Sequence, residues 1–184
     1  MTTQLPVGIA KLVVRRLPGS RHRGVLTAGG LAIPVALGRS GVAFDKREGD
    51  GRTPAGVWRI LRVLYRGDLR PRPATRLPAA PIGVDDGWCD DPDDRRYNCP
   101  VTVPPDSLPF APSHERLRRD DWLYDLLLVL DHNTRPRVRR RGSAIFIHQA
   151  RPGYLATEGC VALAPADMRR LLTRLRPGAR IIIS

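Results

Sequence analysis

A cysteine and a histidine twelve residues apart are the residues of this chain whose types could do covalent chemistry. The apolar run 144–147 ends at His148, and Cys160 follows Gly159. A thiolate attacks carbonyl groups, but a free Cys has a pKa of about 8.5 and is mostly neutral at neutral pH. A neighbouring imidazole can take the thiol proton and so form the attacking species. The pair therefore predicts a nucleophilic Cys160 with His148 as its base.

Either residue alone has an ordinary structural explanation. A small Cys is common in protein cores, and a His at the end of a strand usually makes structural hydrogen bonds. The neighbours favour catalysis, because Gly159 leaves room for a substrate carbonyl to approach a backbone N–H group. Amide groups around Glu158 and Gly159 would then stabilise the oxyanion that forms on attack. His132 is a rival base, but no nucleophile motif accompanies it.

Two separated segments together resemble a known family. The first is Gly49-Asp50-Gly51-Arg52-Thr53-Pro54-Ala55-Gly56-Val57-Trp58, and the second is Thr157-Glu158-Gly159-Cys160-Val161, preceded by His148. In this order and spacing they resemble the YkuD-type L,D-transpeptidase catalytic domains, the cysteine enzymes of peptidoglycan cross-linking. The chain looks like a divergent branch, with Thr-Glu-Gly-Cys in place of Ser-His-Gly-Cys.

The resemblance implies a reaction and a set of residues. Cys160 would attack the carbonyl of a peptidoglycan stem peptide and form a thioester, with His148 as base. An amine acceptor would then resolve the thioester into a new amide, with no metal or organic cofactor. The candidate substrate contacts are Trp88, Tyr97, Asn98 and Thr157. The two aromatic residues are expected to form a wall for a peptide or a sugar.

Two alternatives use the same residues differently. If water resolves the thioester, the domain is a hydrolase: an L,D-carboxypeptidase, an endopeptidase or an amidase that releases an attached lipoprotein. If Cys160 does no chemistry, the domain is a cell-wall-binding module that uses its Arg-rich surface.

The composition favours one domain built mainly of short strands. The chain has 184 residues, 42% of them hydrophobic, with 18 Pro and 17 Gly. That length suits a single domain over residues 1–184, and the Pro and Gly content favours turns over long helices. Apolar patterns predict strands over 12–16, 25–27, 31–37, 57–65, 126–130, 145–148 and 181–183. The resemblance implies a mainly β fold, a YkuD-like β-sandwich of mixed sheets with one or two short α-helices.

Two segments are candidates for these helices. An apolar helical face is formed, between Pro165 and Pro177-Gly178, by Met168, Leu171, Leu172 and Leu175. A short helix is expected to open after Ser113, which is a good N-cap residue. The Asp-rich block 85–94 is expected to be a solvated loop.

The charge balance points to an anionic partner. The formal net charge is +13, and all but two of the 31 basic residues are Arg. Such a surplus is typical of polyanion binding. We expect a peptide that bears carboxylates rather than nucleic acid, because guanidinium groups bind carboxylates through two hydrogen bonds in an Arg-rich cleft. The basic segment 135–141 is expected to be a solvated connection between strands.

The cysteine count and the N-terminus bear on the compartment. Cys89 and Cys99 could pair in an oxidising compartment and leave Cys160 free, or they could stay buried thiols. A zinc site at Cys89 and Cys99 is disfavoured, because the C-x-x-C spacing is missing. The resemblance implies the periplasm or cell envelope. Met1–Lys11 shows no signal peptide, and no stretch approaches the ~20 apolar residues that span a bilayer.

Overall fold

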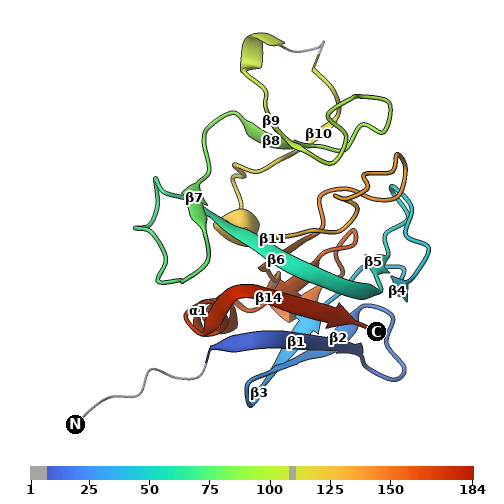
Figure 1. Cartoon of the computed structure of the whole chain (residues 1–184), viewed down its shortest axis with the longest axis vertical. Helices are drawn as coiled ribbons and strands as arrows, with labels where there is room; N and C mark the ends of the chain where they lie inside the picture. The colour runs from blue at the N-terminus through green and yellow to red at the C-terminus, as the bar shows by residue number, and fades with distance from the viewer. Residues whose placement is uncertain (1–7, 108–110) are drawn as a thin grey trace.

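The structure is a computed structural model that describes residues 8–107 and 111–184 (Figure 1). Most of the segment considered for a signal peptide, Met1–Lys11, lies outside the described residues. The strands are β1 (Ile9–Arg16), β2 (Arg23–Ala28), β3 (Leu31–Ala36), β4 (Val42–Ala43), β5 (Thr53–Pro54), β6 (Gly56–Tyr65), β7 (Ala79–Pro81), β8 (Asp86–Cys89), β9 (Pro100–Thr102), β10 (His114–Arg116), β11 (Leu126–Leu130), β12 (Phe146–Gln149), β13 (Val161–Leu163) and β14 (Leu175–Ile183). The helices are α1 (Pro165–Leu172) and the 3-10 helices η1 (Pro105–Ser107), η2 (Trp122–Tyr124) and η3 (Pro152–Tyr154).

The main sheet is mixed and closes on itself. Its strand order is β11-β12-β13-β3-β2-β1-β14-β6-β7, and β11 also pairs with β6, so eight strands form a ring with β7 attached outside it. The pairs β1–β14, β12–β13 and β6–β7 are parallel, and the others are antiparallel. The mainly β, mixed-sheet fold expected from the sequence is confirmed, with its two layers joined at both edges.

The apolar residues that predicted the strands fill the ring. Its core contains side chains from every strand of the ring together with one face of α1, which packs where β1 and β14 begin (Figure 1). In β11, Leu128 and Leu130 point into this core, whereas Leu127 and Val129 belong to a second cluster on the outer side. Strand side chains alternate between faces, so an unbroken apolar run needs cover on both sides.

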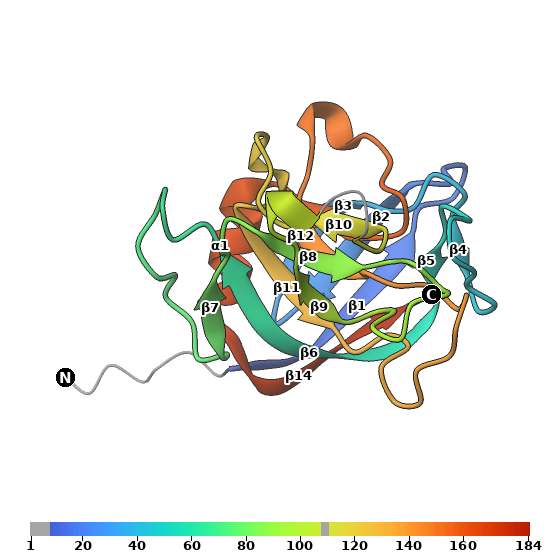
Figure 2. The same ribbon diagram turned by 90° about the horizontal axis from the view of Figure 1, so that it is seen from above.

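A three-stranded sheet, β10-β8-β9, gives that outer cover (Figure 2). The second cluster includes Trp88 of β8, Phe146 of β12 and Cys160, which lies just before β13. The candidate nucleophile therefore sits between the ring and the small sheet, outside the main core.

Three local expectations are wrong. The Asp-rich block 85–94 is not a loop throughout, because β8 lies within it, and no helix follows Ser113, where β10 pairs with β8 instead. Both segments are strands because they bury Trp88 against the ring, a long-range contact that their polar composition does not show. The helix α1 ends at Leu172, and Leu175 opens β14 opposite Ile9. The apolar pattern did not separate the two possibilities, because Leu175 is buried in the strand as it would be on the helix face.

Candidate active site

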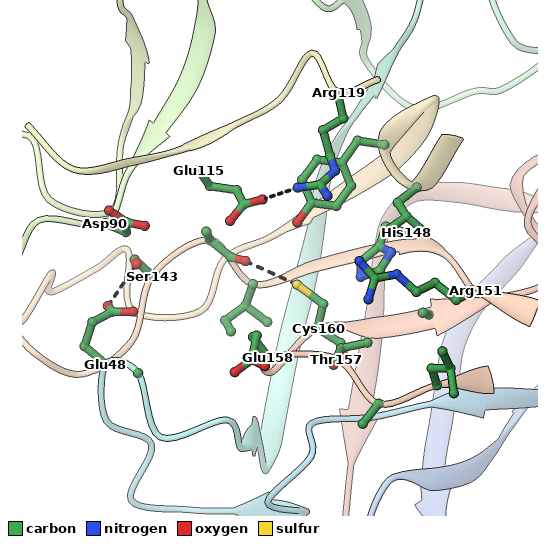
Figure 3. A pocket seen from close by; sticks show the side chains of 18 of the residues that line it. Glu48, Asp90, Glu115, Arg119, Ser143, His148, Arg151, Thr157, Glu158 and Cys160 are labelled. Atoms are coloured by element: carbon green, nitrogen blue, oxygen red, sulfur yellow. Dashed lines mark hydrogen bonds and ion pairs between the residues drawn. The ribbon is translucent and has the colours of Figure 1, made fainter. Parts of the chain in front are cut away.

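The pairing of β12 with β13 brings the candidate base to the candidate nucleophile. His148 lies opposite Ala162 in this parallel pair. Cys160 stands two residues before Ala162, so the two side chains leave the same face of the sheet. The two residues are about 7 Å apart along the strand direction. Both side chains line one cleft of about 420 Å³, and Figure 3 shows them pointing into it. The structure therefore brings together the two residues that the sequence predicted as the catalytic pair.

The Cys160 thiol is held by the backbone of its neighbours. Its Sγ donates to the Ala144 carbonyl at 3.3 Å and accepts from the Phe146 amide at 3.3 Å. The residue is only 8% exposed, and burial raises the pKa of its thiol to about 12. The resting sulfur is therefore protonated, and a base must remove its proton during attack.

His148 is in the form that such a base needs. Its Nδ1 lies 2.8 Å from the Gln149 carbonyl, which can only accept, so Nδ1 carries the hydrogen and Nε2 keeps its lone pair. The ring packs edge-on against Tyr124, with centroids 5.2 Å apart. Burial lowers the pKa of His148 to about 4, so the imidazole is neutral at physiological pH.

A tight turn fixes the nucleophile. The Thr157 hydroxyl donates to the Cys160 carbonyl at 2.7 Å and accepts from the Gly159 amide at 3.2 Å. Gly159 has φ of +143°, and a Cβ there would lie 2.8 Å from the carbonyl oxygen of Arg52. Thr157 thus acts on the turn, and the Gly159 amide is already engaged.

The two sequence segments that carry the resemblance meet at this turn. The Arg52 carbonyl faces Gly159, and the Gly38 amide donates to Thr53 Oγ1 at 2.8 Å. The Arg39 amide donates to the Thr157 carbonyl at 2.9 Å. The upstream Gly-rich turn therefore supports the nucleophile turn from behind.

Acidic residues that the sequence reasoning missed form one wall of the cleft. Glu48, Asp90 and Glu115 lie on one side of Cys160, and His148 and Arg151 lie on the other (Figure 3). Within the described residues, Oδ1 of Asp90 is buried without a hydrogen-bond partner. Burial raises the pKa of Glu115. The nearest sequence signal was position: Glu48 immediately precedes the Gly-rich segment, and Asp90 lies two residues after Trp88.

Two of these acids are tied to their neighbours. Glu115 forms an ion pair with Arg119 at 3.1 Å, and Glu48 accepts from the Ser143 hydroxyl at 2.8 Å and from the Tyr97 hydroxyl. Asp90 is thus the wall's unengaged acid, which matters for the charge of a bound ligand.

The aromatic wall expected from Trp88 and Tyr97 does not face the cleft. Trp88 is buried against Phe146, with ring centroids 5.3 Å apart, and Tyr97 is buried with its hydroxyl on Glu48. Asn98 is also buried, and its side chain accepts from Trp88 Nε1 at 2.9 Å and donates to the His132 carbonyl at 3.0 Å. These three residues support the small sheet rather than contact a ligand in the cleft.

The remaining candidates lie at the edge of the cleft or away from it. The Glu158 side chain is 76% exposed and pairs with Arg39 at 2.8 Å. His132 lies in another groove, where its Nε2 donates to the Arg141 carbonyl at 3.0 Å. Cys89 and Cys99 are free thiols. Their backbones pair through a hydrogen bond of 2.9 Å from the Cys89 amide to the Cys99 carbonyl.

Comparison with known proteins identifies the family. Residues 18–183 match the YkuD family, described as the L,D-transpeptidase catalytic domain. This chain belongs to the YkuD family. No match was found among curated protein sequences. Within the described residues of this YkuD domain, no helix is long and apolar enough to cross a bilayer.

Solved structures similar to this YkuD domain are L,D-transpeptidases of mycobacteria. They are an L,D-transpeptidase from Mycobacterium smegmatis (14% identity, TM-score 0.41), L,D-transpeptidase 1 from Mycobacterium tuberculosis (14%, 0.38) and L,D-transpeptidase 3 from the same organism (16%, 0.40). Each comparison covers 96% of this chain. This chain spans 59% of the Mycobacterium smegmatis protein and 62% of each of the two Mycobacterium tuberculosis proteins.

Proposed function

We propose that this YkuD domain is a cysteine-dependent L,D-transpeptidase that joins a peptidoglycan stem peptide to an amine acceptor. The observation that supports it most is that the pairing of β12 with β13 puts Cys160, just before β13, near His148 of β12, with both side chains lining a single cleft. A thiol and an unprotonated imidazole in one cleft are the parts that acyl transfer through a thioester requires.

The reaction starts from the neutral pair. As Sγ of Cys160 bonds to the stem carbonyl, Nε2 of His148 takes the thiol proton. The C–N bond then breaks, and the imidazolium returns that proton to the leaving amine, which leaves a thioester on Cys160. The acceptor amine attacks the thioester, loses a proton to His148, and the departing thiolate takes that proton back. Because the Gly159 amide is engaged by Thr157, the oxyanion donor in this scheme is the amide of Cys160 itself.

The charges of the cleft suit a zwitterionic ligand. The resemblance to this family implies a donor stem that ends in diaminopimelate and D-alanine, which carries ammonium and carboxylate groups close together. Asp90 on one wall is matched to the ammonium group, and Arg151 beside His148 is matched to a carboxylate. A carboxylate next to His148 would place the leaving D-alanine where its amine can take the proton.

Product analysis tests the proposal. The protein is incubated with a disaccharide-tetrapeptide, with and without an amine acceptor, and the products are identified by mass spectrometry. A new amide to the acceptor is expected; a tripeptide in both incubations would show a hydrolase, and unchanged substrate would refute acyl transfer. Cys160→Ala should abolish the product, whereas Cys99→Ala, a free thiol outside the cleft, should leave it unchanged.

A covalent probe identifies the nucleophile independently. We expect a β-lactam of the carbapenem class to add to Cys160, as measured by intact-mass spectrometry and peptide mapping. Labelling of Cys89 or Cys99 with Cys160 unmodified would contradict the assignment.

A further inference from the structure

A second groove of this domain, rather than the catalytic cleft, is strongly basic. This groove, about 1210 Å³ in volume, runs between the first half of β6 and the segment 131–141, which the two ribbon views place side by side (Figures 1 and 2). Lys46 lines both the groove and the cleft, so the two are neighbours. We refer to it as the β6 groove.

The β6 groove and the cleft differ in charge. The described lining of the β6 groove contains six Lys and Arg side chains and one acid, Asp131. The described lining of the cleft contains three Lys and Arg side chains and four acids. The Arg-rich cleft expected from the sequence therefore exists, but it is not the one that contains Cys160.

The guanidinium groups of the β6 groove are available to a ligand. Among the described residues, none forms an ion pair or a hydrogen bond with the guanidinium group of Arg59, Arg62, Arg135 or Arg141. Asp131, whose Oδ1 accepts from the Arg59 backbone amide at 2.7 Å, offsets only one of the six positive charges of this lining. Like charges held together without partners are costly for the fold, which favours a ligand that supplies the missing anions.

The lining between the arginines is mostly aliphatic. Val57 and Leu61 of β6, 53% and 39% exposed, line the groove, as does Ala79 of β7. Bound single-stranded nucleic acid needs a row of exposed aromatic faces for its bases. Among the described lining residues Phe44 is the exposed aromatic, and the Trp58 ring packs edge-on against His132 at 4.6 Å. Carboxylates spaced by short aliphatic side chains fit this lining better than bases do.

We propose that the β6 groove binds a second carboxylate-bearing peptide stem of the polymer whose stem peptide reacts at Cys160. This inference rests on the proposed function for the identity of the polymer. It separates two tasks: the mixed-charge cleft selects the reacting stem, and the arginines of the β6 groove hold the polymer through a neighbouring stem.

Binding to purified peptidoglycan tests the proposal, measured by co-sedimentation at one fixed ionic strength. The groove variant is Arg59→Gln/Arg62→Gln/Arg141→Gln, and the control variant, Arg15→Gln/Arg169→Gln/Arg170→Gln, removes the same charge from exposed positions outside the groove. Three exposed ion pairs predict about tenfold weaker binding for the groove variant, and little change for the control. Thermal unfolding of both variants checks that the fold is intact.

Chemical amidation of the carboxylates of the peptidoglycan gives a second arm. Amidation should weaken wild-type binding by about the same factor and should change groove-variant binding little, because the same contacts are already lost. Equal losses in the groove and control variants, or wild-type binding that is insensitive to amidation, would overturn the proposal. Tighter wild-type binding to anionic lipid vesicles or single-stranded RNA than to peptidoglycan would overturn it in favour of those partners.

Turnover of the soluble disaccharide-tetrapeptide separates this inference from the proposed function. The groove variant should turn over this small substrate at the wild-type rate, and a loss of turnover would show that the groove belongs to the reacting stem, against the proposal. If wild-type protein gives no turnover, the proposed function fails, while the binding comparison still decides whether the groove holds the polymer.

Discussion

The replacement Gly159→Ala tests whether the turn that contains Cys160 fixes the position of the sulfur. The φ of Gly159, +143°, is in a region that residues with a Cβ rarely adopt. A Cβ would also lie 2.8 Å from the Arg52 carbonyl oxygen, closer than real Cβ atoms come. Neither the backbone carbonyl nor the turn can rotate away as a flexible side chain would, so the turn must shift and carry Cys160 with it.

The expected size of the effect follows from these two terms. Backbone strain of this kind costs about 1–3 kcal/mol. A total near 3 kcal/mol lowers the melting temperature by about 6–12 °C for a domain of this size. A displacement of the reacting sulfur by about 1 Å costs about 10²-fold in rate. We therefore expect acylation of Cys160 to slow by about two orders of magnitude.

Gly153→Ala is the matched control. Gly153 also has positive φ, +71°, and lies within the 3-10 helix η3, but a Cβ there would meet no heavy atom within 4 Å. It should show the backbone strain of about 1–2 kcal/mol without the clash, and near-normal acylation. The assay is the rate of carbapenem adduct formation, followed by intact mass, together with thermal unfolding. Equal acylation rates in Gly159→Ala and wild type would refute the reasoning that this glycine positions the nucleophile.

Three further replacements test other parts of the site. In His148→Gln, the difference in unfolding free energy from the wild type should shrink as the pH falls. Unfolded His takes up a proton near pH 6.5 but buried His148 only near 4, so the wild type loses roughly 3 kcal/mol of stability between those pH values. Parallel stability curves of variant and wild type in denaturant titrations would contradict this. Asn98→Ala should lower the melting temperature by several degrees, because its side chain bonds Trp88, His132, Asn133 and Ala144; a change in substrate KM with an unchanged melting temperature would instead favour a ligand contact. Glu158→Gln should change the free energy of unfolding by less than about 1 kcal/mol, because its ion pair with Arg39 is exposed, and a larger loss in urea titration would show a structural role.

Local patterns were sufficient where a strand's own side chains determine its burial. The run 126–130 is apolar on both faces, and β11 is covered on both faces, by the ring core and by the outer cluster. The two glycines at 29 and 30 lie between β2 and β3 with positive φ, as a hairpin connection requires. The Cys160 and His148 pair could be predicted because each adjoins an apolar strand.

Local patterns failed where a distant segment decides the outcome. Trp88 stands in the Asp-rich segment 85–94, which reads as solvated, yet it is buried because β8 and β10 fold over the outer face of the ring. Tyr97, just beyond this segment, is buried as well. Leu175 continues the helical period of α1, but pairing with β1 places it in a strand. The acids of the cleft wall were missed for the same reason, since Asp90 and Glu115 come together through the β8–β10 pairing.

Net charge shows the limit of composition in another way. A value of +13 predicts an anionic partner, but it does not say which surface binds it. The cleft that contains Cys160 has an acidic wall, whereas the β6 groove is lined by arginines that form no ion pair with a described residue, among them Arg59, Arg62, Arg135 and Arg141. The two surfaces share Lys46, which is paired with Asp50 at 2.5 Å, but Arg59, Arg62 and Arg141 line the groove alone. Polymer affinity and chemistry at Cys160 should therefore be separable by mutation, which one mixed Arg-rich cleft would not allow.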